Sequence, residues 1–347
     1  MRNTAFKAIS LLLCFLLCCL FPGCRAKPTK APEAPPAKVV TDGLGRQVKI
    51  EGEVKRIASF YPIATHYLFL LGEQDKLICS DGVGSREPFF KALAPDLEKL
   101  PRVGGGKGAT NVEALLELKP DLVLVKGHDQ KGVEELASRG LTVYAVKAEQ
   151  PEEVMATMES LGRILGKEDR AEKFVKYYRK TLKDITSKTE KLPESSRPKV
   201  YFAGTDILKV AGGDMYQSRL VEMAGGRPLG KDLKGGWVTV SAEQILKWDP
   251  EVILIPRYGW KDVKGPEAVK EDPRFKDIKA VKENRVWWFP SELTPWDWPT
   301  PQCPLGLIWL AKTLHPELFP DLDPLKEADK FYQEFYGRSF TDLGGKL

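Results

Sequence analysis

A long segment without glycine or proline most constrains how this chain can fold. Residues 168–192 carry apolar side chains at positions 171, 174, 175, 178, 182 and 185. This spacing puts them on one stripe of an α-helix. At 1.5 Å per residue such a helix is about 37 Å long, enough to cross from one domain to another. The segment therefore predicts a single long helix between two parts of the chain.

Short apolar segments alternate with amphipathic segments on both sides of this helix. Before it we expect a hairpin at 39–50, strands at 56–60, 77–80, 122–125 and 141–146, and helices at 64–71, 111–118, 133–138 and 151–165. After it we expect strands at 199–202, 252–255 and 286–289, and helices at 217–224, 242–248, 305–314 and 325–335. This alternation indicates an α/β fold with mostly parallel sheets between flanking helices.

One short unit occurs on each side of the long helix. Residues 111–125 align without gaps on residues 241–255, and both units read as a helix, a proline and an apolar strand. Glu113 aligns with Glu243 at the third position of each unit. The repeat predicts two similar lobes that face each other across a cleft. The expected boundaries are an N-terminal lobe at 39–166, an inter-lobe helix at 167–192 and a C-terminal lobe at 193–347.

The first residues indicate export. Residues 1–23 combine two basic residues with an apolar run of about 13 residues, which is typical of a signal peptide and too short for the ~20 residues of a membrane span. The sequence Leu20-Phe21-Pro22-Gly23-Cys24 resembles a bacterial lipobox, so we expect lipidation of Cys24; ordinary cleavage after Ala26 is the alternative. Residues 24–38, rich in Pro, Ala and Lys, predict an extended tether. The expected location is the periplasm or the outer face of the cytoplasmic membrane.

Charge and cysteine content exclude several classes of protein. The formal net charge is +5 in 347 residues, too small a surplus for a dedicated nucleic-acid scaffold. Six cysteines are too few for a disulfide-dense domain. Outside the N-terminal region only Cys79 and Cys303 remain, and their apolar neighbours predict two buried thiols rather than a metal site or a catalytic thiol. A disulfide between the two lobes is the alternative in an oxidising compartment.

Motifs for catalysis are weak in this sequence. Residues 104–109 contain a G-x-G-x-x-A pattern, but no Gly-Lys-Ser/Thr follows it, and no G-x-S-x-G or H-E-x-x-H occurs. We therefore expect no catalytic residues and no cofactor. An α/β enzyme is a remote alternative. A second alternative is a site for bare Zn²⁺ or Mn²⁺ made by His66, His128 and a carboxylate such as Asp206 or Asp297.

Tryptophan is concentrated in the second half of the chain. Seven of the eight tryptophans fall between residues 237 and 298. Several aromatic residues there are neighbours of Gly or Pro in expected loops: Trp237, Tyr258, Trp260, Trp296 and Trp298. Loops at the carboxyl ends of parallel strands line ligand sites in α/β proteins. Flat aromatic side chains in such loops suit a large and partly apolar ligand.

Several motifs, taken in order, resemble a known family. They are Thr41-Asp42-Gly43-Leu44-Gly45-Arg46, Lys55-Arg56-Ile57-Ala58-Ser59, Pro62-x-Ala64-Thr65, Asn111-Val112-Glu113, Leu118-Lys119-Pro120-Asp121-Leu122-Val123, Ala224-Gly225-Gly226 and Trp237-Val238-Thr239-Val240-Ser241-x-Glu243. The chain resembles the periplasmic substrate-binding proteins of ABC importers for iron–siderophore complexes, haem and cobalamin. This resemblance implies two α/β lobes, one rigid connecting helix, a ligand between the lobes and no catalysis.

The resemblance also implies a class of ligand and a set of protein partners for this chain. We expect a ferric siderophore or haem-like metal chelate, with cobalamin as an alternative. The expected contacts are Tyr61, Arg86, Lys107 and His128 from the first lobe, and Trp237, Tyr258, Trp260 and Trp296 from the second. The expected protein partners are an ABC permease and its ATPase, with Glu113 and Glu243 docking on the permease and the chain itself a monomer. The local alternative is that each Glu is a first-turn helix acid, with Asn111 or Ser241 as the helix cap.

Overall fold

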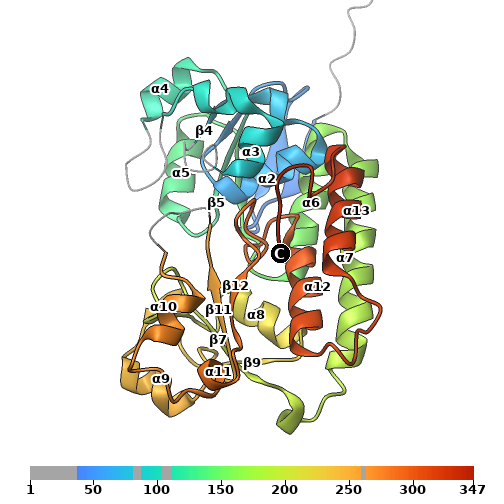
Figure 1. Cartoon of the computed structure of the whole chain (residues 1–347). Helices are drawn as coiled ribbons and strands as arrows, with labels where there is room; N and C mark the ends of the chain where they lie inside the picture. Colours follow the sequence, from blue (N-terminus) through green and yellow to red (C-terminus); the bar gives the residue numbers. More distant parts are fainter. Residues whose placement is uncertain (1–36, 81–86, 104–110, 259–262) are drawn as a thin grey trace, which may run out of the picture. The chain divides into compact units, whose positions relative to one another are not determined.

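The structure is a computed structural model, and it describes residues 37–80, 87–103, 111–258 and 263–347 (Figure 1). Residues 37–347 form one compact unit. It begins with the expected hairpin, in which β1 (Lys38–Thr41) pairs antiparallel with β2 (Gln47–Ile50). The buried carboxylate of Asp42 holds the turn, because it accepts hydrogen bonds from the backbone N–H of Leu44 and from the guanidinium of Arg46.

A four-stranded parallel sheet forms the first half, with the strand order β4-β3-β5-β6. Its strands are β3 (Ile57–Ser59), β4 (Leu77–Ser80), β5 (Leu122–Lys126) and β6 (Val143–Val146). The helices of this half are α2 (Pro62–Leu71), α3 (Pro88–Leu93), α4 (Val112–Glu117), α5 (Gln130–Ser138) and α6 (Pro151–Leu165). Gly72 ends α2 in the left-handed conformation with φ 74°, which glycine adopts without strain.

The second half has a parallel sheet of its own, with the order β12-β11-β7-β9. Its strands are β7 (Lys199–Phe202), β9 (Arg227–Pro228), β11 (Val252–Pro256) and β12 (Val286–Phe289). Two short strands of the same half, β8 (Lys209–Ala211) and β10 (Trp237–Thr239), form a separate antiparallel pair. The helices are α8 (Tyr216–Met223), α9 (Ala242–Trp248), α10 (Pro266–Glu271) and α11 (Lys279–Lys282).

The two sheets have the same topology. Reading each sheet in chain order, β3, β4, β5 and β6 correspond to β7, β9, β11 and β12. The aligned unit extends this match to single residues, because Lys119 and Asp249 both have φ 47° just before a proline. The carboxylates of Asp121 and Glu251 also act alike, since each accepts a backbone N–H at the start of the neighbouring strand, from Arg56 and Lys199. The predicted α/β fold of two similar lobes is confirmed.

Helices lie along one side of both halves in Figure 1. The long helix α7 (Glu168–Thr189) begins at the predicted residue and ends three residues early. It packs against α6 of the first half, α8 of the second half and α12 (Cys303–Leu314). The last helix, α13 (Pro324–Tyr336), returns to α2 of the first half, a contact that the sequence did not predict.

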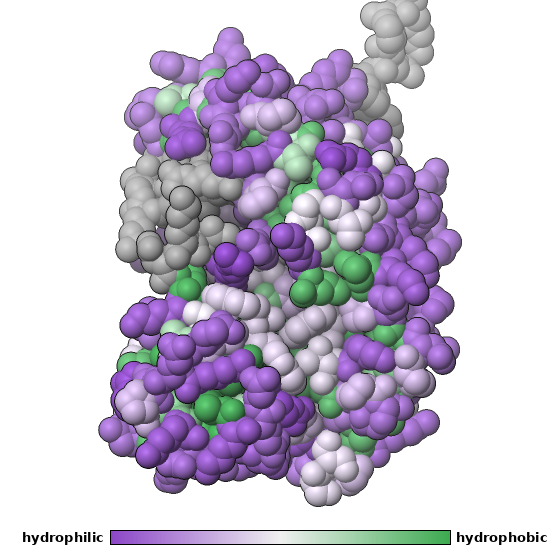
Figure 2. Space-filling view, in the orientation of Figure 1, coloured by the Kyte–Doolittle hydropathy of each residue, from purple (hydrophilic) through white to green (hydrophobic). Residues whose placement is uncertain are grey.

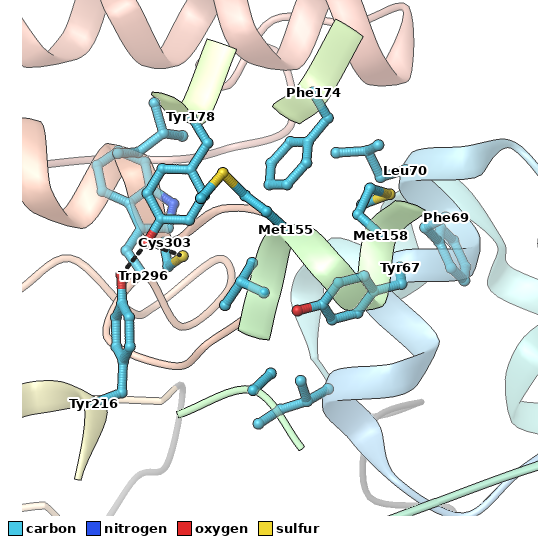
Figure 3. Packing of buried hydrophobic residues seen from close by; sticks show 14 of the residues in the cluster. Tyr67, Phe69, Leu70, Met155, Met158, Phe174, Tyr178, Tyr216, Trp296 and Cys303 are labelled. Atoms are coloured by element: carbon cyan, nitrogen blue, oxygen red, sulfur yellow. Dashed lines mark hydrogen bonds between the residues drawn. The ribbon is translucent and has the colours of Figure 1, made fainter. Parts of the chain in front are cut away.

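One buried apolar cluster extends through both halves and includes residues from Val40 to Leu343. Figure 3 shows its centre, where Tyr178 of α7 faces Tyr216 of α8. Their hydroxyls are 2.9 Å apart, and the thiol of Cys303 lies 3.4 Å from the Tyr178 hydroxyl. Cys79 and Cys303 are both buried, as predicted, and both are free. The surface in Figure 2 is mainly hydrophilic, and within the described ranges no helix has the length and apolarity to cross a membrane.

Candidate functional site

The topology of each sheet marks where a ligand site belongs. In the first sheet the chain passes from β3 to β4 on one side and then to β5 on the other, so the strand order reverses between β3 and β5. In the second sheet the equivalent reversal lies between β7 and β11. Ligands of parallel α/β sheets bind at the carboxyl ends of strands beside such a reversal. The residues that follow these four strands are therefore the candidate site.

Tyr61 and Lys126 lie at the reversal of the first sheet. Tyr61 comes two residues after β3, and Lys126 is the last residue of β5. The Lys126 ammonium lies 6.0 Å from the centre of the Tyr61 ring. Burial, followed by the negative charge of Glu149, raises the pKa of Tyr61 well above its usual value, so its hydroxyl stays protonated. This edge thus presents a cation beside a neutral aromatic hydroxyl.

His128 and Glu149 extend this edge. His128 follows β5, its side chain is 45% exposed, and its Nε2 lies 3.7 Å from a carboxylate oxygen of Glu149. Partial burial, helped by the charges of Lys126 and Lys147, lowers the pKa of His128 and favours the neutral imidazole. Burial raises the pKa of Glu149, an effect that the charge of Lys126 opposes.

Glu149 also links the two halves of the chain. The backbone N–H of Tyr216, the first residue of α8, acts to lower the pKa of Glu149 and so lies near its carboxyl group. The N-terminus of a helix favours a negative charge. Glu149, which follows β6, therefore lies near α8 of the second half.

Trp237 lies at the reversal of the second sheet. It is the first residue of β10 rather than part of a loop, and it is partly exposed. A Cβ placed on Gly204, two residues after β7, would lie 3.3 Å from the indole ring. The ring therefore lies against the backbone at the carboxyl end of β7. Trp237 thus lies at the carboxyl end of a parallel strand, the position expected for it from the sequence.

Tyr258 follows β11 at the same edge, in a left-handed conformation with φ 49°. Its hydroxyl donates a hydrogen bond to Asp297 Oδ2, which also accepts from Gln217 Nε2 at 3.1 Å. Asp297 is fully buried, and this burial raises its pKa to about 6. The Tyr258 ring lies 5.4 Å from that of Trp298. The side chain of Tyr258 is thus held by its hydroxyl, through Asp297, and by its ring, through Trp298.

Trp296 is not at the site, so its predicted ligand contact is wrong. It is fully buried, its Nε1 donates a hydrogen bond to the Tyr332 hydroxyl at 3.3 Å, and its ring lies 4.9 Å from Phe340. Figure 3 shows it among the core residues. The segment that holds Trp296 is irregular but covered by the C-terminal residues, so the rule that loops lie on the surface fails there.

The alternative of a bare-metal site is also wrong for the residues proposed. His66 lies inside α2, fully buried against Phe90 at 4.5 Å between ring centres, whereas His128 is exposed. Asp206 is exposed and caps its own turn. Where side chains are described, no three His, Cys, Asp or Glu residues gather into a metal site. Four predicted residues, Cys24, Arg86, Lys107 and Trp260, lie outside the described residues.

Glu113 and Glu243 occupy equivalent helix starts. Asn111 caps α4 by accepting the backbone N–H of Ala114 at 3.0 Å, and Ser241 caps α9 by accepting that of Gln244 at 3.2 Å. The backbone N–H of Glu243 itself, and then the side chain of Ser241, lower the pKa of Glu243. The predicted local role, two helix starts with a cap and a first-turn acid, is confirmed.

Lys126, Lys147, Glu149 and Gln217 were not among the predicted site residues. The sequence carried a signal for the first three, because each ends a predicted apolar strand or follows it within three residues. For Gln217 we find no such signal, since its role depends on a carboxylate 80 residues later in the chain.

Comparison with known proteins agrees with this geometry. Residues 57–293 match the periplasmic binding protein family. The chain belongs to this family. The molybdate-binding protein MolA of Haemophilus influenzae is 25% identical over 331 residues, 87% of this chain and 92% of that protein. An uncharacterized ABC transporter substrate-binding lipoprotein of Bacillus subtilis, YvrC, is 27% identical over 289 residues, 81% of this chain and 87% of that protein.

A solved structure shows the same fold at higher identity. The periplasmic solute-binding protein of Veillonella parvula is 29% identical and superposes with a TM-score of 0.76, over 88% of this chain and 95% of that one. This periplasmic binding protein is thus the substrate-binding component of an ABC importer. The proteins it resembles are named as binding proteins.

Proposed function

We propose that this binding protein carries an anionic metal chelate of the ferric siderophore or haem class. The observation that carries the proposal concerns the two sheet edges: Lys126 and Tyr61 lie at the edge of the first sheet, and the Trp237 ring lies next to Gly204 at the edge of the second. Cations attract an anionic ligand, and an aromatic face buries its apolar part. Trp237, Tyr258, Tyr61 and His128 are the proposed contacts among the described residues.

The proposal extends to Arg86, Lys107 and Trp260, which the family resemblance implies as further contacts. A tetrahedral oxyanion is the second candidate, because the Haemophilus influenzae relative is named for binding molybdate. The same cations suit both ligands. A metal chelate also requires the aromatic surface, because part of the chelate is apolar, whereas a small oxyanion such as molybdate does not.

A fluorescence titration separates the candidates. We expect ferric siderophores or haem to quench the tryptophan emission of the purified protein, and Trp237→Ala to weaken their binding at least tenfold. Lys126→Ala should weaken them as well, whereas Lys180→Ala, an exposed lysine of α7, is the matched control. Tight molybdate binding that Trp237→Ala leaves unchanged would favour the oxyanion. Binding of cobalamin alone would favour the corrinoid alternative, and binding of none of these would overturn the proposal.

We also propose that Cys24 carries a lipid that holds the protein at the outer face of the cytoplasmic membrane. The lipobox-like sequence and the lipoprotein name of the Bacillus subtilis relative support this. Mass spectrometry of the mature N-terminus tests it. A diacylated N-terminal Cys24 is expected, and Cys24→Ala should release the protein from membranes or block its processing. An unmodified N-terminus at Lys27 would contradict the proposal.

We further propose that Glu113 and Glu243 dock on the permease. Each is exposed, one on each half, at the same place in the repeated unit. Rim charges of this kind mainly set the rate and orientation of association. Glu113→Ala and Glu243→Ala should lower uptake without changing ligand affinity, and the double variant should lose more. Glu267→Ala, at an exposed first-turn glutamate of α10, is the control. Normal uptake by the double variant would leave only the helix-start role.

A further inference from the structure

Two exposed leucines occupy equivalent positions in the two halves. Leu116 of α4 is 36% exposed and Leu246 of α9 is 40% exposed. They align with each other in the repeated unit of residues 111–125 and 241–255. Across the described residues, the large apolar side chains with this much exposure are few: Val39, Leu116, Leu246, Leu325 and Leu347. The face of the molecule in Figure 2 is mainly hydrophilic.

Packing within each half does not explain these leucines. The residue before each one, Leu115 or Ile245, is fully buried and already supplies the apolar contact of its helix with the core. Leu116 and Leu246 are rotated by about 100° from those buried positions, which turns them away from the core. A single exposed leucine needs no special explanation. The same exposed leucine in both copies of a repeat points to a shared use.

Each leucine has an acidic neighbour on the same helix face. Glu113 and Glu243 come three residues earlier, and residues three apart lie side by side on a helix surface. Both glutamates are exposed, and the lowered pKa of Glu243 keeps it ionised at neutral pH. Each half therefore presents the same pair, one carboxylate and one leucine, which we call the Glu–Leu pair. A complementary surface would offer two matching sites, one for each Glu–Leu pair, and each site would place a basic side chain next to an apolar recess.

We propose that Leu116 and Leu246 are matched apolar contacts to the membrane permease, each filling an apolar recess beside a basic side chain. The proposal rests on the proposed function and extends its docking surface from the glutamates to the leucines. A permease with two like halves fits the repetition, because one Glu–Leu pair would meet each half. The carboxylate orients the encounter, and burial of the leucine slows dissociation.

The test uses Leu116→Gln, Leu246→Gln and the double variant of the full chain. Leu325→Gln is the matched control, because Leu325 is 38% exposed on α13 and lies outside the repeated unit. Binding is measured to the purified permease–ATPase complex of the same importer in nanodiscs. We expect each single variant to bind about three- to tenfold more weakly, through faster dissociation. In the double variant the two losses of affinity should combine. Thermal unfolding and ligand titration should not change.

The outcomes separate this inference from the proposed function. If the wild-type protein binds the complex and the double variant binds equally well, or if Leu325→Gln weakens binding as much, the leucine contacts are refuted and the importer role stands. If the wild-type protein does not bind its permease at all, the docking part of the proposed function fails. A wild-type dimer in size-exclusion chromatography that the double variant lacks would assign the leucines to self-association and overturn the inference.

Discussion

Asp297→Asn should remove a pH-dependent loss of stability. Asp297 is fully buried, and this burial raises its pKa from an ordinary value of 3.8 to about 6, although Tyr258 and Gln217 donate to the carboxylate. Between these two values the unfolded chain has released the proton and the folded protein still holds it. Folded stability therefore falls as the pH rises through this window. At about 1.4 kcal/mol per pH unit the whole loss is about 3 kcal/mol.

Urea unfolding followed by tryptophan fluorescence, at pH values from 4 to 7.5, measures this loss. Asparagine cannot ionise but still accepts a hydrogen bond, so its stability should lack this decline. The free energy of unfolding of the variant minus that of the wild type should increase by up to about 3 kcal/mol between pH 4 and pH 7. Asp277→Asn, at an exposed aspartate, should run parallel to the wild type. Parallel profiles for Asp297→Asn would refute the reasoning.

Four further substitutions test the fold. Asn111→Ala and Ser241→Ala each remove the cap acceptor of one helix and should cost about 1 kcal/mol of unfolding free energy, measured in urea; no loss in either would contradict the caps. Gly213→Ala would place a Cβ 1.8 Å from the carbonyl oxygen of Lys231, and its Tm should fall with a loss of about 1–3 kcal/mol. Asp42→Ala removes a buried carboxylate that holds the hairpin turn and should cost about 3 kcal/mol by calorimetry, whereas an unchanged Tm would refute this role.

Elements with strong local signals were predicted to the residue or nearly so. Helix α6 (Pro151–Leu165) has the predicted bounds, since Pro151 sets its first turn and Gly166 ends it with φ 67°. Strand β7 (Lys199–Phe202) and helix α9 (Ala242–Trp248) also match. In each case the apolar period and the residues at the ends suffice, because these signals act within a few positions of the chain.

Features that depend on distant partners were missed. Strand β10 looked like a loop because Trp237 follows two glycines, and it is a strand only because Lys209–Ala211 pairs with it. Trp296 lies in an irregular segment, and the residues that bury it, Tyr332 and Phe340, come more than 30 positions later. The strand-end rule located the edges of the site. It could not tell which aromatic residues at those edges turn into the core.

The return of the last helix to the first half has a consequence for how this protein acquires its structure. Phe89 of α3 packs edge-on against Tyr332 and Tyr336 of α13, and the carbonyl of Phe335 accepts a hydrogen bond from Arg170 at the start of α7. The first half therefore lacks part of its core until the final residues have been synthesised. The first half of the nascent chain therefore cannot complete its fold before α13 has been synthesised. Truncation before α13 should destabilise this first half, although it is far from α13 in the sequence. A chain that completes its core last is well suited to crossing a membrane in the unfolded state before it folds.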